Sequence, residues 1–189
     1  MCSSDLCTGP GIARNVASVY LPTNDTFFTG RIDHKISDTD SFFGRYTFDD
    51  AASTSSGELF MFRNDNTSRQ QYLTLVETHF FSLSTINSFR ASFTRPVELI
   101  NALYEPLPKE LYFVPGAQNF GHIVVPGLNE FGPNWTAPDG NYMTTFQFAD
   151  DVVMQRGAHG LKMGVDIHRN RWNIFNNNSK SGVWTFNDL

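Results

Sequence analysis

The sequence is poor in three features that would place it in a common class of protein: cysteine, charged residues and long apolar runs. Only two cysteines, Cys2 and Cys7, occur among its 189 residues. They lack the second pair of ligands that a structural zinc site needs. They could close a small disulfide loop or remain incidental thiols, so they do not indicate whether the protein's compartment is oxidising or reducing.

Charged residues make up 17% of the chain, below the usual share of about a quarter. The net charge is -5, and no basic stripe offsets it. A phosphate backbone needs a basic surface, so we predict no nucleic-acid partner.

No run of about 18 apolar residues occurs, which predicts no transmembrane helix. The first residues also lack a basic segment followed by an apolar one, so no signal peptide is visible. Together with the strand pattern described next, this leads us to expect an internal part of a longer chain.

What the sequence does contain is regular alternation of apolar and polar residues, clearest between Tyr142 and Phe175. Such alternation sends apolar side chains to one face of a strand and polar ones to the other. The segment Arg156–Gly160 separates two such runs, and we expect its two glycines to supply the positive φ of a tight hairpin. Asp150 falls on the apolar parity, so we predict a β-bulge near Asp150–Asp151 that turns it away.

The same alternation predicts further strands, and their connections are short and long in turn. The expected strands lie near residues 27–36, 42–48, 70–81 and 88–93, with a seventh beginning at 183. We expect a loop or irregular lead-in over 1–24 and long loops at about 50–68, 96–141 and 176–182.

Short turns at one edge and long loops at the other are typical of outer-membrane β-barrels. The expected strands are also close to the roughly 9–11 residues that cross a bilayer at a tilt. We therefore predict an all-β, antiparallel up-and-down meander over 25–189, forming about six or seven strands of a larger transmembrane barrel. Seven strands are too few to close. The alternative is a soluble secreted β-sandwich that binds a glycan.

Aromatic residues gather near the expected strand ends, as an interfacial girdle would require. They are Phe27, Phe42, Phe43, Phe48, Phe80, Phe81, Trp172, Phe175 and Trp184.

Two hairpins also resemble those of a known family. The first is FTGRIDHKISD at 28–38 followed by FGRY at 43–46, and the second is FADD at 148–151 followed by RGAHGLKMGVDI at 156–167. Both are similar to barrel hairpins of TonB-dependent outer-membrane receptors, in particular the Oar-like group. The likeness spans most of residues 25–189, and Met154 departs from it where the family often has an aromatic residue.

The resemblance implies a fragment of a 22-stranded barrel in the outer membrane of a Gram-negative cell. Its expected partners are outer-membrane lipid, the plug and remaining strands of the same receptor, and the TonB complex, contacted through parts not present here. The implied function is energised uptake of a ligand that the sequence does not identify.

Polar residues of the second hairpin could be imagined as a metal cluster, but lining of a hydrated lumen explains them better. They are Asp150, Asp151, His159, Asp166 and His168. No set of side chains has a spacing that implies catalysis, so we expect no enzyme, metal or cofactor. Candidates for ligand contact lie in or beside the longest loop, where scaffolds meet ligands: Phe120, His122, Trp135 and Tyr142.

Overall fold

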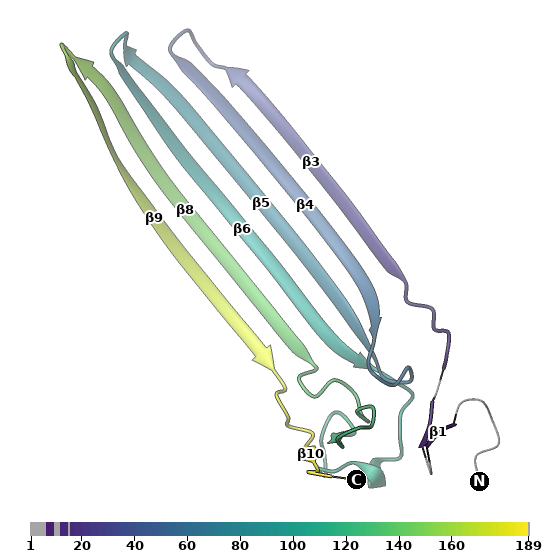
Figure 1. The fold of residues 1–189 in the computed structure, drawn as a ribbon. Helices are drawn as coiled ribbons and strands as arrows, with labels where there is room; N and C mark the ends of the chain where they lie inside the picture. Colours follow the sequence, from purple (N-terminus) through teal and green to yellow (C-terminus); the bar gives the residue numbers. More distant parts are fainter. Residues whose placement is uncertain (1–6, 10–11, 15, 189) are drawn as a thin grey trace.

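The computed structural model describes residues 7–9, 12–14 and 16–188. Its main feature is one antiparallel sheet of six long strands that follow each other in chain order (Figure 1). This arrangement confirms the predicted up-and-down meander. The strands are β3 (Thr23–Lys35), β4 (Asp40–Ser56), β5 (Arg63–Ser82), β6 (Thr85–Leu103), β8 (Asp139–Arg156) and β9 (His159–Asn176).

The minor elements lie outside this sheet. β1 (Cys7–Gly9) pairs with β2 (Ile12–Ala13), so the expected lead-in contains a short hairpin before β3 begins. The pairing of Cys2 with Cys7 lies outside the described residues. β7 (His122–Val124) belongs to the long loop, which also holds the 3-10 turn η1 (Lys109–Leu111). Within the described residues, no helix is long and apolar enough to cross a membrane.

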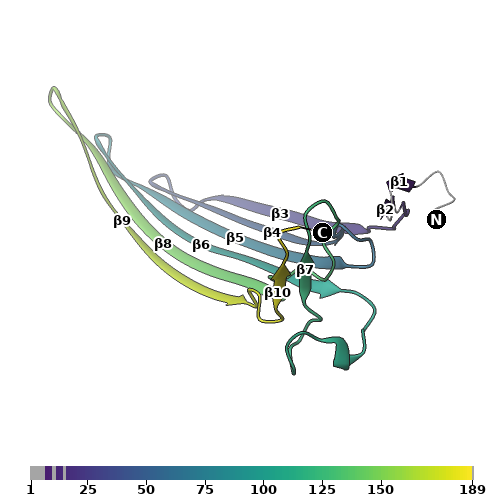
Figure 2. The ribbon, with the colours of Figure 1, turned by 60° about the horizontal axis from the view of Figure 1, so that its bottom comes forward.

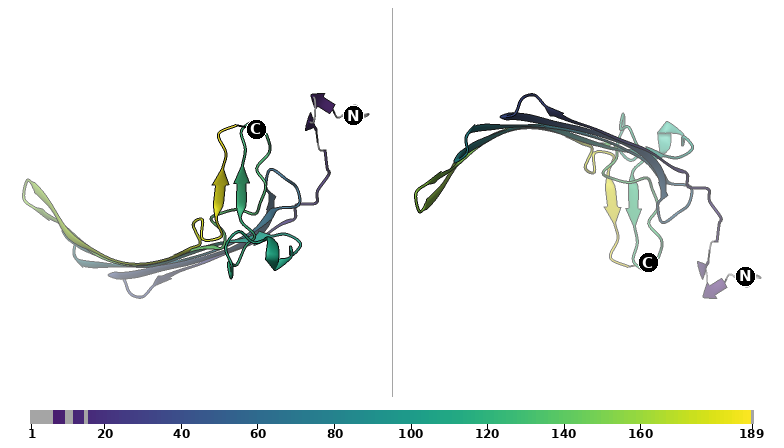
Figure 3. Two further views of the ribbon diagram at one scale, coloured as in Figure 1. Left: turned by 90° about the horizontal axis from the view of Figure 1, so that it is seen from below. Right: turned by 90° about the horizontal axis from the view of Figure 1, so that it is seen from above.

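The six-stranded sheet is a single curved layer. Figure 3 shows no second layer of strands packed on either of its faces among the described residues. The alternative of a β-sandwich is therefore wrong, because a sandwich needs two packed sheets. In the described part of the chain, β3 and β9 each pair with one neighbour only, so the sheet is open at both edges.

The cross-strand register separates the side chains into two faces. The first, which we call the apolar face, carries an apolar band whose members are half-buried or exposed, with Phe28 (58%), Ile32 (69%) and Ile167 (60%) among the exposed ones. A soluble protein rarely exposes so continuous an apolar patch. The band consists of Phe28, Ile32, Phe42, Tyr46, Phe48, Leu73, Leu75, Phe89, Ala91, Phe93, Phe146, Phe148, Val152, Leu161, Met163, Val165 and Ile167.

The apolar band runs obliquely across the strands. One row of directly paired residues joins Ile32, Gly44, Leu75, Ala91, Phe148 and Ile167. On β3 the row passes through Ile32, the band member nearest the short turns. On β9 it passes through Ile167, the band member farthest from those turns. Strands of a membrane barrel tilt by about 35–45°, so a band at constant depth must cross them obliquely. The inclination is thus the one expected of a barrel wall.

The predicted β-bulge at Asp150–Asp151 is wrong. Asp150 pairs in regular register with Phe89 on one side and Val165 on the other. Its side chain therefore lies on the apolar face, where its Oδ1 accepts a hydrogen bond from Asn87 Nδ2 at 2.6 Å. A polar partner on the neighbouring strand, and not a kink, accommodates the carboxylate.

The short connections lie together at one end of the sheet (Figure 1), as predicted. They span residues 36–39, 83–84 and 157–158. Gly157 has φ +60°, which suits the first position of a two-residue hairpin turn. Gly160 does not have positive φ and lies in β9, so only one of the two glycines has the expected conformation.

The long connections are shorter than predicted because the strands continue past the apolar band. The expected loop 50–68 is reduced to 57–62, and 96–141 is reduced to 104–138, whereas 177–182 agrees with expectation. Polar residues in these segments pair across strands, as in the bidentate contact of Arg69 with Asp50 (2.9 and 3.2 Å). A backbone ladder needs no apolar side chains, so polarity alone did not end the strands.

The expected seventh strand does not extend the meander. β10 (Val183–Thr185) instead pairs in parallel with β7 of the long loop. The aromatic girdle is also only partly correct, because register places four of its members on the opposite, polar face: Phe27, Phe43, Phe80 and Trp172. Phe43 there lies under the Arg31 guanidinium, 4.2 Å from its ring centre.

Candidate functional site

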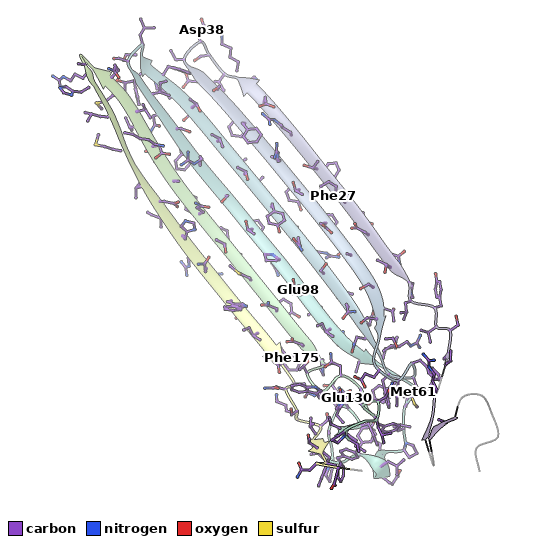
Figure 4. All side chains as sticks on the ribbon, viewed as in Figure 1. Phe27, Asp38, Met61, Glu98, Glu130 and Phe175 are labelled. Atoms are coloured by element: carbon purple, nitrogen blue, oxygen red, sulfur yellow. The ribbon has the colours of Figure 1, made fainter. Side chains whose placement is uncertain are left out.

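Three connections at the long-loop end of the sheet fold together into one body (Figure 2). They are residues 57–62, 104–138 and 177–186, and we call them the loop assembly. In Figure 4, Met61 and Glu130 lie within it, and Phe175 marks the end of β9 that borders it. Most of the buried side chains of the described chain belong to this assembly, including Phe62, Phe120, Pro133 and Ala137.

Aromatic rings form the centre of the loop assembly. Phe62 contacts Tyr104 and Phe131 edge-on, with ring centres 5.8 and 5.2 Å apart. Phe120 in turn lies 5.0 Å from Phe113 and 5.7 Å from Phe131. Edge-on aromatic contacts add to the gain from burial, so these rings join the 57–62 loop to the long loop.

Close backbone approach makes this packing possible at two glycines. A Cβ added at Gly121 would lie 2.5 Å from the Phe113 ring, and one at Gly132 would lie 2.3 Å from the Gly121 carbonyl oxygen. Both glycines also have positive φ. Only glycine fits such positions without strain.

Polar contacts fasten the third connection to the long loop. The Asn119 side chain donates to the Ala137 carbonyl at 2.7 Å, and the Asn177 side chain donates to the same oxygen at 2.9 Å. The backbone N–H of Asn119 donates to Ser181 Oγ, and the backbone N–H of Ser179 donates to the Trp135 carbonyl oxygen. Buried polar groups need such partners, so the contacts define one arrangement of the loops.

Tyr104 is a titratable group at the centre of the loop assembly. Its Oη accepts a hydrogen bond from the Phe120 N–H at 3.0 Å. Burial, aided by a hydrogen bond with Tyr112, raises the pKa of Tyr104 to about 12. The neutral phenol is therefore the form that fits the folded loops.

The four candidates for ligand contact do not form one site. Phe120 and His122 are buried within the loop assembly. The His122 Nδ1 lies 3.0 Å from the Pro133 carbonyl and its Nε2 lies 2.9 Å from Glu130, so the ring is held inside the loops. Trp135 remains 43% exposed on the same assembly, whereas Tyr142 belongs to β8 and lies on the apolar face.

On the polar face, the acidic side chains of the second hairpin have polar partners. Asp151 contacts Arg90 at 2.6 Å, and Asp166 accepts hydrogen bonds from Gln147 and lies 2.9 Å from His168. Asp150 lies on the opposite face. His159 begins β9 beside the 157–158 turn.

The structure does bring together one group that the sequence reasoning missed. Asp40, Glu77 and His79 each offer an atom within 4.8 Å of the others, at the short-turn end of the apolar face. Ser37 and Thr39 already donate hydroxyl hydrogen bonds to Asp40, and His79 contacts it as well. Only the pairing of β4 with β5 places these residues side by side, so a search along the strands one at a time could not find them.

The apolar face also contains an open groove, of about 710 Å³, beyond the long-loop side of the apolar band. Its polar lining comes from β3, β4, β5, β6 and β8 and includes Asn24, Asp50, Arg69, Gln71, Arg95 and Tyr142. Residues from strands so distant in sequence converge here because of the meander's register. Sequence pattern alone did not predict the groove, because the strands were expected to end at 48 and 93, before it begins.

A family model described as an outer membrane beta barrel domain matches residues 6–189. No curated protein and no solved structure gives a significant match.

Proposed function

Because that match covers nearly all of its length, the chain belongs to the outer membrane beta barrel domain family, and we propose that it serves ligand uptake across that membrane. The protein is located in the outer membrane, where its six strands form barrel wall. In such barrels the short turns face the periplasm, the long loops face outward and the apolar side contacts lipid.

The wall proposed here is part of a larger barrel. Six strands are fewer than the roughly eight of the smallest filled barrels. The apolar face would contact lipid, and the polar face with its Arg90–Asp151 contact would line the lumen. Further strands would then pair with the free edges of β3 and β9.

We further propose that the barrel is that of a TonB-dependent receptor of the Oar-like group. The likeness of the β3–β4 and β8–β9 hairpins to that group supports this proposal, and the spacing across both turns agrees with it. Ligand would bind at the outer loops and plug, and an inner-membrane complex would pull the plug. The present chain would supply wall and outer loops, so its role would be binding and transport and not catalysis.

The observation that carries the proposal is the loop assembly. Loops on a rigid scaffold are where ligands are met, and here three loops share one core on the outward end of the wall. Trp135 remains exposed on it and offers an aromatic surface. Phe120 and His122, which lie inside, would hold that surface in place.

Uptake can be tested in cells that contain or lack the gene of the full-length protein, each with and without the TonB protein. The solutes removed from the growth medium are compared by mass spectrometry. We expect at least one solute to be removed only when both proteins are present. Removal that persists without TonB would contradict energised uptake, and the absence of any difference would contradict a role in transport.

A further inference from the structure

Arginines lie on the apolar face just beyond the band, on its outward side. Arg171 pairs directly with Thr144, and the pairing of Thr94 with Thr145 brings Arg95 level with Thr144 from the other side. Arg169 lies one step nearer the band, opposite Phe146. Adjacent strands are about 4.8 Å apart, so Arg95 and Arg171 flank Thr144 within reach of one small anion.

The charge of these arginines is not balanced on their own face. Asp50 is the nearest acid of the groove, and it is engaged by Arg69. Among the described residues, Arg95, Arg169 and Arg171 have no carboxylate within 4.0 Å. Asp65 lies on this face as well, but farther out, where it pairs with Asn101. The groove therefore keeps a surplus of positive charge.

The neighbours of these arginines are suited to a polar headgroup attached to apolar chains. Gln71 and Tyr142 line the groove together with Arg95. On the side of the groove nearest the apolar band, the ring centres of Phe93 and Phe146 lie 5.4 Å apart. A ligand bound there would meet charge and hydrogen-bond donors at one end and the lipid-facing band at the other.

We propose that Arg95 and Arg171, with the groove beside them, bind the phosphorylated headgroup of a lipid in the outer leaflet. Guanidinium groups bind phosphate through paired N–H donors, and arginines at the membrane surface attract anionic lipid. The acyl chains of this lipid would lie on Phe93 and Phe146. The inference depends on the location of the protein in the outer membrane and not on the proposed uptake.

The test uses the full-length protein in mild detergent, with lipid A as the probe because it carries two phosphates on a glucosamine disaccharide. Binding is measured by native mass spectrometry. For R95Q/R171Q we expect roughly 30-fold weaker binding, from the loss of two arginines near a headgroup. The matched control is R45Q, which removes one arginine from the polar face and should bind as the unaltered protein does.

Three results would overturn the proposal: equal binding by R95Q/R171Q, an equal loss in R45Q, or equal binding of dephosphorylated lipid A. Heat-modifiable migration on gels establishes that each variant is folded. If R95Q/R171Q does not fold, R95K/R171K provides the test, because it keeps the charge but not the paired donors. We then expect a partial loss of about threefold to tenfold, and unchanged binding would contradict the role of the guanidinium groups.

Discussion

At the scale of single residues, Asn87 and Asp150 show how a carboxylate is tolerated on the apolar face. Asp150 stands between Phe89 and Val165 in the register and accepts the Asn87 amide at 2.6 Å. An acidic side chain facing lipid costs free energy, and a hydrogen bond from a neighbouring strand offsets part of that cost. The two residues therefore depend on each other.

We predict that N87V lowers the free energy of unfolding by about 1–3 kcal/mol, because it leaves a carboxylate unpaired in an apolar setting. The double variant N87V/D150V should be at least as stable as the unaltered protein, since it removes both polar groups. Urea unfolding of the full-length protein in lipid vesicles measures this. If the double variant were as unstable as N87V, the unpaired Asp150 carboxylate would not be the cause of the lost stability.

Tyr104 gives the loop assembly a pH dependence. Its pKa in the folded state, about 12, lies above the usual value of 10, so the folded state holds its proton more tightly than the unfolded state does. The stabilisation is complete below pH 10 and is lost as pH rises from 10 towards 12. We predict that cleavage of the long loop by proteinase K accelerates across this interval.

The matched variant is Y104F, which cannot titrate. It should lose about 0.5–1.5 kcal/mol of loop stability at neutral pH, because the Phe120 N–H loses its acceptor. Its cleavage rate should rise less between pH 10 and 12 than that of the unaltered protein. If the cleavage rates of the two proteins rose equally between pH 10 and 12, groups other than Tyr104 would cause the pH dependence.

At the scale of elements, the β8–β9 hairpin depends on close packing over a glycine. A Cβ added at Gly164 would lie 2.7 Å from the Asp150 carbonyl oxygen and 2.2 Å from Asp151 Oδ1. Asp151 is held there by its contact with Arg90 on β6. The absence of a side chain at Gly164 thus leaves room for the Asp151 carboxylate that pairs with Arg90.

We predict that G164A destabilises the hairpin by about 1–3 kcal/mol, as overpacking against backbone does. G160A, four residues away on the same strand, is the control. Its Cβ would meet only the flexible end of Gln155, at 3.3 Å, so the cost should stay within about 0.5 kcal/mol. The temperature at which heat-modifiable migration is lost reports the difference, and equal temperatures for both variants would contradict it.

At the scale of the whole molecule, two parts are stabilised in different ways. The sheet has almost no buried core of its own: among its hydrophobic residues only Ala149 is buried. Its apolar face needs lipid and its edges need further strands. The loop assembly, by contrast, has a buried centre around Phe62 and Phe120. The assembly can therefore loosen while the wall remains intact.

We predict that F62A destabilises the loop assembly by about 3–5 kcal/mol through the cavity it leaves, while the barrel keeps its β-sheet circular dichroism. Cleavage within 104–138 by a protease added outside the cell measures the loosening. F60A is the control, because Phe60 belongs to the same loop and is 42% exposed. Loss of the sheet signal in F62A would show that the two parts are not independent.

Much of the fold followed from local pattern. Alternation such as Leu161, Met163, Val165 and Ile167 predicted a two-faced sheet, and Gly157 marked a real turn. The order of short and long connections predicted the meander, and the hairpin resemblance agreed with the outer-membrane family. These features are encoded within a few residues, because strand alternation and turn conformation depend on near neighbours.

The candidate site was less predictable. Phe120 and His122 are inside the loops, and the side chain of Tyr142 belongs to the apolar face of the sheet. Residues flanking 57–62 form strands although they are polar, and β10 joins the long loop and not the meander. Each difference depends on contacts with residues distant in sequence, and the local alternation of apolar and polar residues does not predict such contacts.

By itself, then, the sequence determined that this protein is an antiparallel meander with one apolar face for the membrane. Only the tertiary structure decided how far the strands continue, which face each aromatic residue occupies and what surrounds each charge. The physical reason is that side-chain parity is set within a strand, whereas register between strands sets the Asn87–Asp150 bond and places Arg95 and Arg171 on either side of Thr144.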